Sequence, residues 1–313
     1  MALQQTLAVY ELIDLPSVNG GDIEALFAPY ADAGVTVVTQ RVTEGRVADF
    51  IKIVIPGAGG KTAGGAAPTL GLIGRNGAIG ARPDRIAQVS DADGATAVIA
   101  AGLKLAQMRA RGDTLQGDVI VTTHLCTDAP ITPRQPVDFM GMPCSSTTMN
   151  TLEVDPAMDA ILSVDTSKGN RVFNERGFAI TPTAKQGYLL RVSDSLLNVM
   201  QQTTGHLPRV MPLTTQDITD YDNGLYHINS IMQPTVATEA PVVGVPITAQ
   251  AAVAGSGGSA SHEVDIAEAV RFCVEVAIQY TDRQRYQCDF YSETEYARLL
   301  SLYGPMTVLQ KAA

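Results

Sequence analysis

Short apolar runs alternate with helical patterns along most of this chain. The runs are rich in β-branched residues, as buried strands are. They cover residues 35–42, 49–55, 69–74, 118–123, 160–164 and 240–248. The helical patterns cover residues 3–33, 95–111, 194–204 and 265–280.

The first two apolar runs predict antiparallel strands, whereas the later ones predict parallel strands. Residues 35–42 and 49–55 are joined by the turn Thr43-Glu44-Gly45, which predicts an antiparallel hairpin toward an edge of the sheet. The later runs are apolar throughout, as central parallel strands are. Strands that alternate with helices predict an α/β fold, a three-layer sandwich around a mixed, mostly parallel sheet. No stretch poor in apolar residues divides the chain, so we expect a single domain over 1–313.

Composition narrows the class of protein. The 313 residues are 45% apolar with a net charge of −10, a mean hydropathy of +0.09 and a pI near 4.8. Such a chain is globular, and it does not suit nucleic acid or anionic membranes, which attract clustered Lys and Arg. We find no signal peptide and no apolar run near the roughly 18 residues of a membrane helix. The four cysteines form no CxxC pair, which favours reduced thiols in a cytoplasmic protein.

Four polar residues stand close to the ends of apolar runs. Asp91 precedes a helix rich in Ala and Gly, His124 and Asp165 directly follow buried runs, and His262 follows a glycine-rich loop. The carboxyl ends of parallel strands meet at one edge of an open sheet, and Asp and His are common metal ligands. We therefore predict that these four residues ligate one or two divalent ions, with zinc as the first choice.

Each of these positions also has an interpretation without chemistry. Asp91 would cap the helix that follows it, as would Asp93. Asp165 would cap the turn after its strand. A lone histidine is more often packed or exposed than a metal ligand, which applies to His124 and His262.

The order of these parts resembles the two-zinc exopeptidase superfamily of aminopeptidases and deacylases. Members of that superfamily carry an Asp before a small-residue helix, a later Asp after a hydrophobic strand, and a His in the loop before the last helix. Asp91, Asp165 and His262 match these positions. More narrowly, nearly the whole chain resembles a bacterial and archaeal family catalogued as domain of unknown function 1177. The segments that carry this likeness are 90–95, 163–171 and 260–266.

Two parts of the superfamily pattern are missing. No His-x-Asp occurs between residues 50 and 90, and the run 118–123 leads to His124 where the superfamily has two adjacent glutamates. A hydrolase of this class needs a base that takes a proton from water. Asp128 and Glu263 are the candidate catalytic residues for that step.

Further residues are expected to support the site or to contact the substrate. Lys168 and Arg171 follow Asp165 closely and would receive a substrate carboxylate, unless they are solvated surface cations. The whole set is Asp93, Cys126, Lys168, Arg171, Asp217 and His227.

The leading hypothesis is a metal-dependent hydrolase of an amide or peptide bond, acting through a metal-activated water. The alternative is a non-catalytic descendant of the fold that binds a small ligand or forms an oligomer, which the missing motifs favour. A nucleotide-binding protein is disfavoured because no phosphate-binding motif is present. As partners we expect a small peptide-like or amino-acid-derived substrate and further copies in a homo-oligomer, with neither nucleic acid nor membrane.

Overall fold

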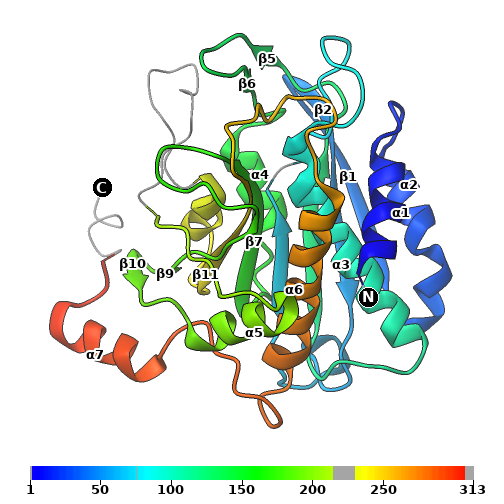
Figure 1. The fold of residues 1–313 in the computed structure, drawn as a ribbon. Helices are drawn as coiled ribbons and strands as arrows, with labels where there is room; N and C mark the ends of the chain where they lie inside the picture. The colour runs from blue at the N-terminus through cyan, green and yellow to red at the C-terminus, as the bar shows by residue number, and fades with distance from the viewer. Residues whose placement is uncertain (1, 76, 214–229, 307–313) are drawn as a thin grey trace.

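A mixed β-sheet runs through the centre of the protein. The computed structural model describes residues 2–75, 77–213 and 230–306. Within these ranges nine strands form one sheet in the order β1-β2-β4-β3-β7-β11-β9-β10, with β8 beside β11 (Figure 1). Their bounds are β1 Thr36–Glu44, β2 Arg46–Ile55, β3 Leu70–Gly74, β4 Val119–Leu125, β7 Ala160–Lys168, β8 Gly177–Phe178, β9 Thr183–Lys185, β10 Tyr188–Leu190 and β11 Val242–Ala249. A separate pair is formed by β5 (Ile131–Thr132) and β6 (Phe139–Met140).

The parallel strands occupy the middle of the sheet, as predicted. Strands β4, β3, β7 and β11 run parallel to one another. The predicted hairpin is confirmed: β1 and β2 are antiparallel across Gly45 and form one edge. The other edge consists of β9 and β10, which the sequence patterns did not reveal.

Helices cover both faces of the sheet, which makes the predicted three-layer sandwich. On one face α1 (Leu3–Ile13), α3 (Asp93–Ala110), α5 (Asp194–Thr204) and α6 (Glu263–Thr281) pack on one another. On the other face lie α4 (Ser146–Glu153) and the 3-10 helix η4 (Ser230–Val236). The remaining α-helices are α2 (Gly20–Phe27), against β1, and α7 (Glu293–Tyr303), which projects at the lower left of Figure 1. None of the described helices has the length and apolar content to cross a membrane.

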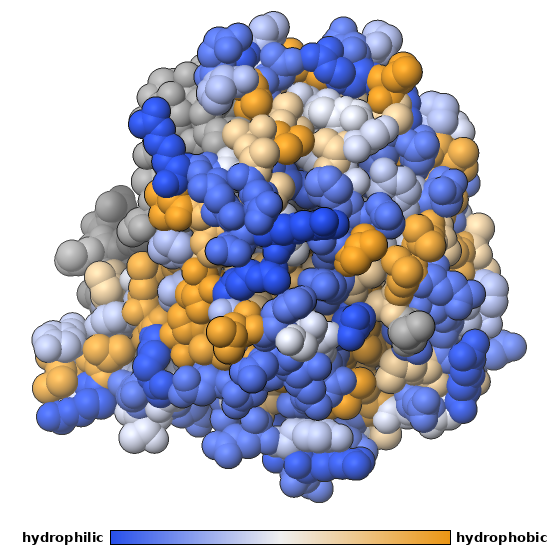
Figure 2. Space-filling view, in the orientation of Figure 1, coloured by the Kyte–Doolittle hydropathy of each residue, from blue (hydrophilic) through white to orange (hydrophobic). Residues whose placement is uncertain are grey.

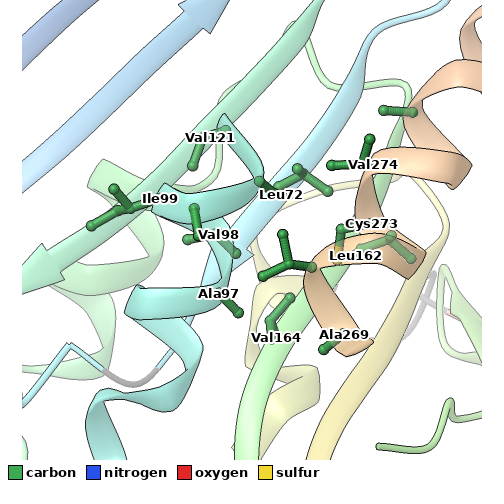
Figure 3. Close-up of a cluster of buried hydrophobic side chains, with 14 of the residues drawn as sticks. Leu72, Ala97, Val98, Ile99, Val121, Leu162, Val164, Ala269, Cys273 and Val274 are labelled. Carbon is green, nitrogen blue, oxygen red and sulfur yellow. The ribbon is translucent and has the colours of Figure 1, made fainter. Parts of the chain in front are cut away.

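The main core lies between the sheet and helices α3 and α6. Figure 3 shows Val98 of α3 and Cys273 of α6 beside Leu72 and Leu162 of the central strands, all of them buried. Helix α3 approaches the sheet closely because its residues are small; a Cβ at Gly102 would lie 3.3 Å from a methyl group of β4. The outer surface of this helical layer is mostly polar, with apolar patches among the charged side chains (Figure 2).

Replacing Gly74 with alanine is expected to destabilise the protein by about 1–3 kcal/mol, because it overpacks this core. The added Cβ would lie 2.8 Å from Val98 Cγ2 and 2.9 Å from both the Gly94 carbonyl oxygen and Thr123 Oγ1. Urea unfolding measures the change. A Cβ at Gly59 would meet its nearest atoms only at 3.7 Å, so Gly59→Ala is the control and should shift stability by less than about 0.5 kcal/mol. Equal losses in both variants would contradict the packing argument.

Candidate functional site

A cavity of about 160 Å³ lies at the carboxyl ends of the central parallel strands. One wall is polar and comes from the ends of β3, β4 and β7 and from the 3-10 turn η3 (Ser90–Ala92). The polar wall contains Arg75, Asp91, His124, Asp165 and Lys168. A second wall comes from the segment that includes β5 and β6, whose hairpin lies above these strand ends in Figure 1. The apolar residues of that wall are Val137, Phe139, Met140, Met142 and Pro143.

Asp91 and Asp165 reach the cavity from adjoining segments. The Thr166 hydroxyl, next to Asp165, donates to the carbonyl of Ser90 at 2.8 Å, and the Asp91 N–H donates to the carbonyl of Gly255 at 3.1 Å. Gly255 packs against the Asp91 carboxylate so closely that a Cβ there would lie 2.3 Å from its Oδ1. A carboxylate from the turn η3 and a carboxylate from β7 therefore line one cavity.

His124 belongs to a buried polar network. Its Nδ1 lies 2.6 Å from Oε1 of Glu153, at the end of α4. Arg75 donates to the other carboxylate oxygen of Glu153 at 2.5 Å and to Oε1 of Gln233 at 2.7 Å. The ring of Phe50 packs beside the imidazole, with the ring centroids 5.4 Å apart. The histidine is therefore held in one orientation at the cavity wall.

Lys168 and Asp93 form a buried ion pair beside the same cavity. Lys168 Nζ lies 2.6 Å from Asp93 Oδ2, and their side chains are 2% and 0% exposed. Burial raises the pKa of the Asp93 carboxyl, and the Lys168 ammonium opposes that shift. Lys168 is thus not a surface cation, and Asp93 does not cap α3, whose N-cap residue is Ala92.

The two predicted bases lie outside the cavity lining. After β4 the chain turns so that Asp128 bridges to Ala81, and its half-exposed side chain lies 3.5 Å from Arg46 Nη1. Glu263 is exposed at the start of α6. Cys126 is also buried away from the cavity; burial raises the pKa of its thiol to about 12, and Sγ donates to Asp128 at 3.4 Å.

The predicted ligand His262 is likewise separated from the polar wall. It is the N-cap residue of α6, its side chain is 47% exposed, and its Nδ1 lies 3.9 Å from Asp265. Arg171 is exposed and does not line the cavity either. Asp217 and His227 lie outside the described residues.

The described residues do not assemble the predicted four-ligand metal site. Across the three described ranges, no three His, Cys, Asp or Glu side chains gather into a group that could hold a metal ion. Asp91, His124 and Asp165 share the cavity, but the imidazole is engaged with Glu153 and does not join the two carboxylates in such a group.

Sequence reasoning missed the partners of His124. The sequence does contain a signal for Arg75, because this residue directly follows the apolar run 69–74 and so stands at the end of a predicted strand. Glu153 and Gln233 had none, because each reaches the site through tertiary packing of the layer behind the sheet.

Known structures share this fold at low sequence identity. The bottromycin maturation enzyme BotP in complex with Mn aligns with a TM-score of 0.51 and 13% identity, over 88% of this chain and 71% of that chain. A Zn-dependent exopeptidase from Parabacteroides distasonis aligns with a TM-score of 0.50 and 11% identity, over 89% and 98% of the two chains. At these identities the likeness shows the three-layer fold. No curated protein matches the sequence.

One protein family does match the sequence over most of its length. The family DUF1177, described as a protein of unknown function, matches residues 39–313. The matched range contains the whole cavity lining. The resemblance noted from the sequence is thereby confirmed, and the chain belongs to the DUF1177 family of proteins of unknown function.

Proposed function

We propose that the cavity is the active site of a hydrolase that cleaves an amide or peptide bond in a small peptide-like substrate. The observation that carries the proposal is that Asp91, His124 and Asp165 line one cavity at the carboxyl ends of the parallel strands. Ligand sites of open α/β sheets lie at these ends. The similar solved structures are a maturation enzyme in complex with Mn and a Zn-dependent exopeptidase, and they support a metal-dependent reaction on this fold.

The donor chemistry fits a divalent cation that keeps part of its water shell. Asp91 and Asp165 supply carboxylate oxygens from adjoining segments. Mg²⁺ and Mn²⁺ accept one or two carboxylates with water as further ligands, whereas a zinc site takes three or four protein ligands, a set the described residues do not gather. We therefore propose Mn²⁺ or Mg²⁺ at these carboxylates in preference to zinc. Such a cation would polarise the scissile carbonyl and acidify the attacking water.

The shape of the cavity supports a small substrate with an apolar group. Its volume of about 160 Å³ is below the roughly 300–1,000 Å³ of sites for drug-sized ligands. Apolar side chains such as those of Phe139, Met140 and Met142 line the same cavity as the polar wall. A dipeptide or an N-acyl amino acid with an aliphatic side chain offers both the amide and the apolar contact.

Metal-free protein titrated with Mn²⁺, Mg²⁺ and Zn²⁺ tests the proposal. We expect Mn²⁺ or Mg²⁺ to bind with one ion per chain and to permit release of amine from a panel of dipeptides and N-acyl amino acids. Gly255→Ala displaces the Asp91 carboxylate without removing its charge, so it should weaken cation binding about tenfold or more. Asp113 is exposed, and Asp113→Asn is the control. Absence of both binding and amine release would refute the hydrolase.

Ligand binding without catalysis is the second candidate, and one observation favours it. Both cations of the polar wall are already paired within the protein, Lys168 with Asp93 and Arg75 with Glu153. Polar groups held in place in this way can orient a polar ligand without any reaction. Saturable binding of panel compounds, with no amine release under any metal, would establish this function instead.

A further inference from the structure

We infer that Glu153, itself held by Arg75, positions His124 as the proton acceptor of the cavity; this rests on the proposed hydrolase function. The three side chains connect the ends of β4, α4 and β3. Oε1 of Glu153 lies 2.6 Å from His124 Nδ1, and Oε2 of Glu153 accepts a hydrogen bond from Arg75 at 2.5 Å. The exposed fractions are 1% for His124, 0% for Glu153 and 7% for Arg75. Bulk water therefore does not compete for these bonds.

The contacts of Glu153 determine which nitrogen of His124 carries the proton. Arg75 is always charged, and its hydrogen bond keeps the Glu153 carboxylate ionised. An ionised carboxylate only accepts hydrogen bonds, so Nδ1 of His124 must donate. In the neutral imidazole the nitrogen that carries no hydrogen is then Nε2.

The packing around His124 keeps the ring from turning. Gly77 lies on one side so closely that a Cβ there would be 2.6 Å from the ring Cδ2. Phe50 packs beside the ring, and Gln233 holds the second terminal nitrogen of Arg75 at 2.7 Å. A base fixed in this way meets the geometric demand of general-base catalysis.

In this role Nε2 accepts one proton from the water that attacks the amide carbon. The new C–O bond forms as the water gives its proton to Nε2, and the imidazolium that results is stabilised by Glu153. The same proton then passes to the leaving nitrogen as the C–N bond breaks. The imidazole returns to its neutral form, and the new carboxylic acid gives its proton to the released amine. One amide and one water thus become one carboxylate and one ammonium group.

The tautomer of His124 is measurable without substrate or metal. The chain contains four histidines, and a His124→Gln variant assigns the signal of His124 in ¹⁵N spectra of the rings. We expect the neutral ring to carry its hydrogen on Nδ1. Glu153→Gln should abolish this single tautomer. Because that variant leaves Arg75 buried and unpaired, the double variant Arg75→Gln with Glu153→Gln repeats the test with no net buried charge. A hydrogen on Nε2 in the wild type would overturn the inference.

Turnover and cation binding separate a proton acceptor from a metal ligand. His124→Gln is expected to lower kcat by about 10²–10⁴-fold while the affinity for Mn²⁺ stays within about twofold. His206 is exposed in a turn, and His206→Gln is the matched control. Loss of the cation in His124→Gln would make His124 a ligand and overturn the inference. If the wild type hydrolyses none of the panel, the proposed function fails, whereas the tautomer still decides whether Glu153 positions His124.

Discussion

Replacing Lys168 with methionine is expected to lower the free energy of unfolding by about 3–5 kcal/mol, the usual result of removing one partner of a buried ion pair. Lys168 Nζ lies 2.6 Å from Asp93 Oδ2, and both side chains are almost fully buried. Methionine preserves most of the volume, so the loss comes from the carboxylate that remains without its cation. Urea unfolding at pH 7.5 measures the difference.

An exposed ion pair of similar geometry provides the control. Lys61 Nζ lies 2.8 Å from Asp159 Oδ1, but these side chains are 41% and 39% exposed. Lys61→Met should therefore change stability by no more than about 1 kcal/mol. Adding Asp93→Asn to Lys168→Met removes the unpaired charge and should recover most of the loss. Similar effects of the two lysine variants would show that burial does not set the strength of the Lys168 pair.

The loss in Lys168→Met should also depend on pH. Burial raises the pKa of Asp93 in the wild type, and removal of the nearest cation raises it further. At Asp93 the folded variant then binds a proton more tightly than its unfolded chain does, so the contribution of this carboxyl to stability is greatest at acidic pH and is lost as the pH rises through its folded-state pKa. The gap between wild type and variant is expected to shrink as the pH is lowered.

The centre of the fold was predictable because the buried strands there consist almost entirely of apolar residues. Every residue of β3 is buried, as is every residue of β11, so these strands read as uninterrupted apolar runs. The far edge was not predictable. Strand β8 has two residues, and β9 and β10 have three each, which is too short for a period to stand out.

The candidate site was predictable only for side chains whose place is determined by their position near the end of a strand. His124 and Asp165 lie at the cavity because a residue at the end of a buried parallel strand points to the same edge as its neighbours. Asp128 does not, because the turn after β4 redirects the chain toward Arg46. His262 precedes a helix as predicted, but nothing in the sequence fixes the direction of its side chain, which faces solvent.

Asp165→Asn is expected to lower kcat/KM for the amide substrate by about 10³-fold, which corresponds to about 4 kcal/mol of transition-state stabilisation. The Asp165 Oδ1 accepts the Thr166 N–H at 2.7 Å, and the asparagine oxygen can accept the same bond. The backbone at the end of β7 should therefore keep its place while the charge that holds the cation is lost. Titration with Mn²⁺ should show weaker binding in parallel with the loss of turnover.

Asp128→Asn is expected to keep its turnover, and this variant tests whether the cavity is the active site. The sequence makes Asp128 the nearest replacement for the missing glutamate base, but the structure places its side chain beside Arg46, outside the cavity lining. A base must come within hydrogen-bond reach of the water it activates, so turnover in Asp128→Asn should stay within about twofold of the wild type. If Asp128→Asn loses turnover while Asp165→Asn keeps full activity, the reaction does not take place in this cavity, because Asp165 lines the cavity and Asp128 does not.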